Sequence, residues 1–137
     1  MTTPGYTSPF ARLPGLRETS PATARISVVV PFFNEEECVE FVLREILTSQ
    51  PDAEVIAVDD GSADRTWEII QKIPGVTPLR LTQNRGQSGA LFAGLHFAAG
   101  DILVMLDGDG QNDPADIAKL VDLIRSGQCD VAVGRRA

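Results

Sequence analysis

The fold is decided by the stretch from Ile26 to Ser49, which reads ISVVVPFFNEEECVEFVLREILTS. Its first residues are mostly β-branched and nearly all apolar, which is typical of a strand covered on both faces. Apolar side chains then recur with helical spacing, at Val39, Val42, Leu43, Ile46 and Leu47. This spacing predicts an amphipathic helix from about Glu35 to Ser49. A strand followed at once by such a helix is the repeating unit of α/β proteins.

The same alternation continues along the rest of the sequence. Further strands are predicted over residues 55–58, 76–81, 102–106 and 130–133. Further helices are predicted from a cap at Ser62 or Asp64 to Ile70, through residues 90–98, and from Asp113-Pro114 to Gly127. Short connections with intervening helices favour right-handed crossovers. We therefore expect an α/β fold, with a mainly parallel sheet and helices on both faces.

Charge and composition divide the chain into two parts. The 137 residues carry 12 Lys and Arg against 19 Asp and Glu, for a formal net charge of −7. Residues 1–25 are rich in Pro, Thr and Ser and hold more basic than acidic side chains, which predicts a flexible leader. Residues 26–137 then form one domain that contains the whole acidic excess. This excess argues against a nucleic-acid partner, because such a partner requires a basic surface.

The sequence shows no pattern of membrane insertion or secretion. Its longest apolar stretch, residues 26–33, is far shorter than the roughly 20 residues of a membrane span. Cys38 and Cys129 form no Cys-x-x-Cys pair and are typical of idle thiols in a reducing compartment. We expect a cytoplasmic protein with no transmembrane segment in this chain.

Acidic residues gather where the predicted strands end, which is where open α/β sheets bind ligands. The segment 107–113 reads DGDGQND. Carboxylates this close repel one another, and a hard divalent cation removes the penalty. We therefore predict a metal site at Asp107, Asp109 and Gln111, and expect Gly108 to let a bulky ligand approach. Asp113 is interpreted as a helix cap only.

Other binding patterns are absent or open to two interpretations. The 107–113 segment lacks the glycine that a calcium EF-hand loop needs at its sixth position, and no phosphate-binding or dinucleotide glycine motif occurs. Asp59 and Asp60 are suited to accept hydrogen bonds from a ribose or a base, or else they form a simple turn with Gly61. Arg85 is either an anion contact at a helix start or a solvated side chain.

Six ordered blocks of the sequence resemble the family 2 glycosyltransferases of the GT-A fold, a Rossmann-like arrangement that binds nucleotide sugars. The likeness is strongest to the branch of dolichol-phosphate mannose synthase and polyprenyl-phosphate glycosyltransferases. The blocks cover residues 30–35, 58–66, 84–90, 100–101, 107–114 and 130–136.

The resemblance implies a role for each matching residue. It places Pro31, Phe33 and Glu35 against the base and ribose of the donor. It makes Asp59 and Asp60 nucleoside contacts, and Asp107, Gly108, Asp109 and Gln111 part of the donor site. Mg²⁺ or Mn²⁺ would be held at Asp107, Asp109 and Gln111, and Arg136 would meet the acceptor phosphate.

The implied reaction is a metal-dependent, inverting transfer of a sugar from a UDP- or GDP-sugar to a polyprenyl phosphate at the cytoplasmic face of a membrane. A phosphate acceptor is already anionic, whereas a hydroxyl acceptor would need a base, for which the candidates are Asp109 or an acid in the part of the family that follows Arg136. Family members have Ala and Leu where this chain has Gly108 and Gly110, and they continue beyond Arg136. The sequence therefore resembles the nucleotide-binding half of such an enzyme, and a truncated, non-catalytic module is the alternative.

Overall fold

The computed structural model describes residues 23–110 and 112–134. Strands and helices alternate along them in the order β1 (Ile26–Phe32), α1 (Val39–Ser49), β2 (Glu54–Asp59), α2 (Thr66–Lys72), β3 (Val76–Arg80), α3 (Gly86–Phe97), β4 (Ile102–Met105) and α4 (Asp116–Arg125). The strands form one sheet in the order β3-β2-β1-β4, and every pair is parallel. The predicted α/β class is therefore confirmed.

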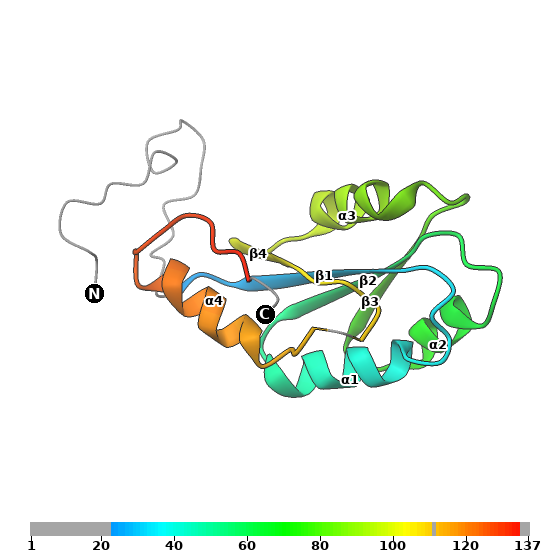
Figure 1. Cartoon of the computed structure of the whole chain (residues 1–137), viewed down its shortest axis with the longest axis horizontal. Coiled ribbons are helices and arrows are strands. Elements are labelled where there is room, and N and C mark those ends of the chain that lie inside the picture. The colour runs from blue at the N-terminus through cyan, green and yellow to red at the C-terminus, as the bar shows by residue number, and fades with distance from the viewer. Residues whose placement is uncertain (1–22, 111, 135–137) are drawn as a thin grey trace.

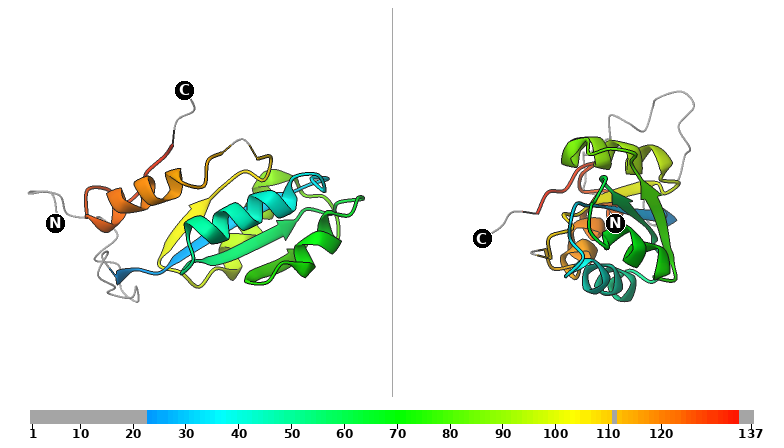
Figure 2. Two further views of the ribbon diagram at one scale, coloured as in Figure 1. Left: turned by 90° about the horizontal axis from the view of Figure 1, so that it is seen from below. Right: turned by 90° about the vertical axis from the view of Figure 1, so that its right-hand side faces the viewer.

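The sheet is the middle of three layers. Helix α3 lies on one face, and α1, α2 and α4 lie on the other (Figures 1 and 2). The side chains of β1 alternate between the two faces: Val28 and Val30 pack with α1, α2 and α4, whereas Val29 packs with Ala90 of α3. All seven residues of β1 are buried. This burial on both faces is the reason for the continuous apolar stretch from which the strand was predicted.

The strand order creates a crevice at one edge of the sheet. From β1 the chain moves outward through β2 and β3, and then crosses back to place β4 on the other side of β1. Such a reversal parts the loops that follow the two neighbouring strands on either side of it, here the central strand β1 and the edge strand β4. A ligand site is therefore expected between the carboxyl ends of β1 and β4.

Three boundaries differ from the sequence-based expectation. Residues 130–134 are not a strand, and Val131 and Val133 are 72% and 82% exposed, so the predicted fifth strand is wrong. Strand propensity alone does not form a strand where no neighbouring strand pairs with the segment. Helix α1 begins only at Val39, after a hydrogen-bonded turn from Glu35. Ala24, predicted as leader, is buried, and its carbonyl accepts a hydrogen bond from Arg125.

No helix in the described part of the chain combines the length and the hydrophobicity needed to cross a membrane.

Candidate functional site

An open pocket of about 370 Å³ lies at the carboxyl edge of the sheet. The loop after β1 supplies Pro31, Phe33 and Glu35 to its wall, and the loop after β4 supplies Asp107 and Asp109. The volume lies within the range of ordinary small-molecule sites. The structure thus brings together, in one pocket, two segments that are more than 70 residues apart in the sequence.

The electrostatic character of this pocket is strongly acidic. Four carboxylates line it, those of Glu35, Asp60, Asp107 and Asp109. Among its described lining residues there is no Lys or Arg. An anionic ligand therefore meets a repulsive wall unless a cation enters with it.

The two neighbouring acids after β2 have different environments. Asp59 is fully buried, and its Oδ2 lies 3.3 Å from Nε of Arg80. Arg80 is the last residue of β3, and its guanidinium lies over the Trp67 ring. Asp59 Oδ1 accepts a hydrogen bond from the Ser62 N–H at 3.2 Å. Asp59 does not line the pocket, so this structure gives it a scaffold contact rather than a ligand contact.

Asp60, by contrast, lines the pocket while being only 3% exposed. Its Oδ1 accepts a hydrogen bond from the backbone N–H of Arg85 at 2.7 Å. This bond ties the loop before α3 to the end of β2, and Arg85 is not among the residues that line the pocket. The structure therefore separates the predicted pair into one buried acid and one acid at the pocket.

Five hydrogen bonds join the loop after β1 to the start of α2, and we call them the loop bridge. The N–H groups of residues 34, 35 and 36 donate to Ser62 Oγ (2.9 Å), Thr66 Oγ1 (2.9 Å) and Asp64 Oδ2 (3.2 Å). In return, the N–H groups of residues 63 and 65 donate to Asn34 Oδ1 (2.9 Å) and Glu36 Oε2 (3.1 Å).

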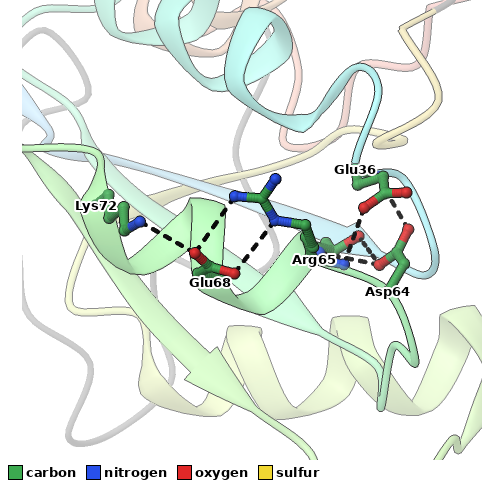
Figure 3. A network of polar contacts seen from close by, with 6 residues as sticks. Glu36, Asp64, Arg65, Glu68 and Lys72 are labelled. Atoms are coloured by element: carbon green, nitrogen blue, oxygen red, sulfur yellow. Dashed lines mark hydrogen bonds and ion pairs between the residues drawn. The ribbon is translucent and has the colours of Figure 1, made fainter.

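Figure 3 shows the outer end of the loop bridge, with Glu36 and Asp64 facing each other across the two loops. Desolvation raises the pKa of Asp64, but hydrogen bonds from Thr66 and from the Glu36 N–H outweigh it, so that the pKa is lower than usual. The same network continues along α2, where Arg65 and Lys72 both pair with Glu68 on the surface. Of the two predicted cap residues, Asp64 accepts the Thr66 N–H at the start of α2, whereas Ser62 Oγ accepts the Asn34 N–H; the N-cap position itself is Arg65, which makes no side-chain cap bond.

The loop after β4 is held against β1 at close range. Gly108 is buried, and a Cβ on it would lie 2.4 Å from the Pro31 carbonyl oxygen and 2.5 Å from the Phe32 ring. Gly108 also lines the pocket, so the expectation that it lets a ligand approach stays a prediction. The close approach places Asp107 and Asp109 beside the end of β1, because they flank Gly108.

Two further side chains at this loop were not predicted from the sequence as site residues. Gln87 lines the pocket from the first turn of α3, and its Nε2 donates a hydrogen bond to Asp107 Oδ1. The Cys38 thiol lies 3.3 Å from Glu35 Oε2 and 3.5 Å from the Gly108 carbonyl oxygen. Burial, followed by the hydrogen bond and charge of Glu35, raises the pKa of Cys38 to about 11. For these two residues, the only hint in the sequence was that Gln87 lies within residues 84–90, one of the six blocks that resemble the family.

The structure describes two of the three predicted metal ligands. Asp107 and Asp109 line the same pocket, but Gln111 lies outside the described residues, as does Arg136. The described residues contain no group of three or more His, Cys, Asp or Glu able to hold a metal. Mg²⁺, however, is commonly held by one or two carboxylates together with substrate phosphates and water, and Mn²⁺ accepts the same oxygen donors. The carboxylates of Asp107 and Asp109 fit that mode of binding.

Two residues away from the pocket make local contacts. Asp113, which we expect to cap a helix, accepts a hydrogen bond on Oδ1 from the Ala115 N–H in the turn before α4, and the N-cap position of that helix is Ala115. His96 stacks on Phe92 within α3, with 4.7 Å between the ring centroids, and it does not line the pocket.

Comparison with known proteins agrees with this geometry. Residues 27–137 match the family described as Glycosyl transferase family 2. The chain is 37% identical over 117 residues to a dolichol-phosphate mannosyltransferase of Pyrococcus furiosus. That match covers 82% of this chain and 33% of the relative. The chain thus spans about one third of the length of this relative.

Two solved structures are similar in fold. One is a mannosyltransferase of Pyrobaculum calidifontis in complex with GDP-Man and Mn²⁺, with a TM-score of 0.64 and 28% identity over 78% of this chain and 33% of that one. The other is the glucosyl-3-phosphoglycerate synthase of Mycobacterium tuberculosis with Mn²⁺, UDP and glucosyl-3-phosphoglycerate. Its TM-score is 0.68 and its identity 29%, over 85% of this chain and 46% of that one.

Proposed function

Because the chain belongs to glycosyl transferase family 2, we propose that its acidic pocket binds a nucleoside-diphosphate sugar together with a divalent metal ion. The observation that carries the proposal is the acidic lining: four carboxylates and, among the described lining residues, no basic side chain. A diphosphate enters such a pocket only with a cation. The similar structures that contain GDP-Man with Mn²⁺, or UDP with Mn²⁺, support a UDP- or GDP-sugar as the donor.

The residues of the pocket divide the donor between two walls. Phe33 and Glu35 form the wall for the nucleoside, because a ring face stacks on a base and a carboxylate accepts from a ribose hydroxyl or a base N–H. Asp60 is placed to contribute to the same wall. Asp107 and Asp109 form the wall for the diphosphate, and together with the predicted ligand Gln111 they would hold Mg²⁺ or Mn²⁺. When bound, the metal neutralises charge on the leaving nucleoside diphosphate.

The acceptor is proposed to be a polyprenyl phosphate at the cytoplasmic face of a membrane, and the transfer to invert the anomeric centre. The similarity to a dolichol-phosphate mannosyltransferase supports this acceptor class. Arg136 is the proposed contact for the acceptor phosphate. An anionic phosphate attacks without a base, so Asp109 would act as a general base only toward a hydroxyl acceptor.

Calorimetric titration with UDP- and GDP-sugars, with and without Mn²⁺, tests the donor site. We expect binding that requires the metal and that is abolished in the variant Asp107→Ala/Asp109→Ala. The matched control is Asp116→Ala/Asp122→Ala, which removes two exposed acids of α4 and leaves the pocket intact. Equal binding by the pocket variant and the wild-type chain would contradict the metal site.

A second candidate function is a module that binds the nucleotide sugar without transferring it. It is favoured by one observation, namely that the chain spans only 33% of the dolichol-phosphate mannosyltransferase it resembles. Incubation of the chain with radiolabelled donor, Mn²⁺ and polyprenyl phosphate distinguishes the two candidates. Formation of a labelled lipid product would exclude the non-catalytic module.

A further inference from the structure

Asn34 has a backbone conformation unlike that of any other non-glycine residue in the described part of the chain. Its φ is 51°, in the left-handed region, which costs energy for a residue that carries a Cβ. Asn tolerates this region better than most residues but still less readily than Gly. Such a conformation persists only where the surroundings hold it, and these conformations concentrate at ligand sites.

Asn34 lies where the chain must turn sharply between β1 and the turn before α1, and we call this sharp turn at Asn34 the corner. Phe32 ends β1, and the carbonyl of Glu35 already accepts the N–H groups of Cys38 and Val39, which form the first turn before α1. The chain therefore turns from strand to helix within two residues. Asn34 makes that turn between Phe33 and Glu35, both of which line the pocket.

The loop bridge holds the corner in place from the other side. Asn34 contributes two of its five bonds, one through its own N–H to Ser62 Oγ and one through Oδ1 from the Ala63 N–H, each 2.9 Å long. The anchors are fixed, since Ser62 is 5% exposed and Thr66 is fully buried. The loop itself is at the surface, with Phe33 46% exposed. The shape of the exposed loop is thus set by its bonds to a rigid neighbour.

We propose that Asn34 is a positioning residue for the nucleoside part of the donor, because its left-handed corner and its bond to Ala63 direct Phe33 and Glu35 into the pocket. This inference rests on the proposed function, in which that wall of the pocket receives the nucleoside. Asn34 is not among the residues that line the pocket. It acts through its two neighbours, and it has no part in holding the metal at the opposite wall.

A residue that fixes a loop changes ligand affinity through the fraction of molecules that are ready to bind. If a substitution lowers that fraction, the apparent dissociation constant rises by the same factor. The variant Asn34→Ala loses both the tolerance for the left-handed region and the Oδ1 acceptor. Asn34→Gly loses only the acceptor, because Gly adopts positive φ freely.

The test compares these two variants with a control that carries the same kind of backbone strain elsewhere. Gly75, between α2 and β3, has a φ of 87°, and a Cβ there would meet only Leu47, at 3.4 Å. Gly75→Ala therefore adds strain without a severe clash and away from the pocket. For each protein, the dissociation constants of UDP and GDP in the presence of Mn²⁺ are measured by calorimetry. Hydrogen exchange of the backbone N–H groups of residues 35 and 36 is measured without nucleotide.

We expect Asn34→Ala to bind UDP or GDP at least about tenfold more weakly, and Asn34→Gly about threefold more weakly. Gly75→Ala should bind as the wild-type chain does, although it also loses stability. The amides of residues 35 and 36 should exchange faster in Asn34→Ala but not in Gly75→Ala, because only the former weakens the loop bridge. The dependence on Mn²⁺ should be the same in all four proteins.

Three outcomes separate failure of the inference from failure of the proposed function. If the wild-type chain binds UDP or GDP and Asn34→Ala binds equally well, the positioning role is refuted and the donor site stands. An equal loss in Gly75→Ala would also refute it, because general destabilisation would then explain the effect. If the wild-type chain binds neither nucleotide, the proposed function is refuted, and the assignment of Asn34 to a nucleoside falls with it.

Discussion

Gly94 is the contact through which α3 packs on the sheet, and replacing it tests the packing directly. A Cβ at this position would lie 2.3 Å from Val29 Cγ1 on β1 and 3.0 Å from Val58 Cγ2 on β2. Carbon atoms in normal contact are about 3.5 to 4.0 Å apart, so Gly94→Ala forces the helix or the strand to move by about 1 Å. Over-packing of this kind costs about 1 to 3 kcal/mol.

The gain in helix propensity offsets part of this cost. Alanine is favoured over glycine within a helix by up to about 1 kcal/mol. We therefore expect Gly94→Ala to lower the free energy of unfolding by about 1 to 2 kcal/mol and the melting temperature by several degrees. Urea denaturation followed by circular dichroism measures the difference, and an unchanged m-value would show that the unfolded state is unaffected.

A double-mutant cycle with Val29→Ala distinguishes the steric cause from other effects. Val29→Ala removes the methyl groups that a Cβ on residue 94 would meet, so it should partly rescue Gly94→Ala. The two changes should deviate from additivity by at least about 1 kcal/mol in the stabilising direction. Additive effects, or a Gly94→Ala variant as stable as the wild-type chain, would refute the packing of α3 on β1.

Three other predictions concern the charged and titratable groups near the pocket. The pKa of Asp64 is lowered because the hydrogen bonds that it accepts from Thr66 and from the Glu36 N–H outweigh desolvation. The charged carboxylate therefore stabilises the fold above about pH 4, and this stabilisation is lost as the pH falls through the lowered pKa. Asp64→Asn should therefore lose less stability than the wild-type chain when urea denaturation is repeated at pH 3 instead of pH 7; equal losses would contradict the assignment. Arg80→Met should lower the free energy of unfolding by about 2 kcal/mol, because it leaves the buried Asp59 without its cation, and Asp59→Asn in the same chain should restore part of the loss. An Arg80→Met variant with wild-type stability would show that the ion pair is not needed. Burial and Glu35 raise the pKa of Cys38 to about 11. In a Cys129→Ser background, the alkylation rate of Cys38 should therefore rise about tenfold per pH unit from pH 8 to pH 10, because only the thiolate reacts. A plateau of that rate below pH 9 would contradict the raised pKa.

The parts of the fold that were predictable are those specified by local periodicity. The β-branched stretch at the start of β1 and the helical spacing after Val39 each depend on a few neighbouring residues, and both elements are present. The segment 130–133 has the same local signature as a strand but is not one, because a strand also needs a partner in space. Periodicity therefore predicted which segments prefer a strand, but not which of them would pair.

The candidate site was predictable to the level of its loops but not of its individual contacts. Adjacent Asp59 and Asp60 have the same chemistry, and their different roles depend on the pairing of β2 with β3, which puts Arg80 opposite Asp59. That register is a property of the assembled sheet. The bond from Gln87 to Asp107 likewise joins a helix to a loop 20 residues away. The left-handed conformation of Asn34 has no signal in composition or spacing.

The acidic residues near the pocket serve two different physical purposes. Asp59 is paired with Arg80, and Asp64 accepts backbone N–H groups, so their charges are balanced by the protein itself. The acids that line the pocket also accept hydrogen bonds, Asp60 from the Arg85 N–H and Asp107 from Gln87, but no Lys or Arg is among the described residues of that lining. Two like charges about 4 Å apart repel by about 4 kcal/mol at an effective dielectric constant of 20, so a bare diphosphate would be strongly disfavoured there. A divalent cation attracts both the carboxylates and the diphosphate, so it replaces their mutual repulsion with two attractions. Under the proposed function, the same acidity that would exclude a free nucleotide makes the pocket selective for a nucleotide that arrives with its metal.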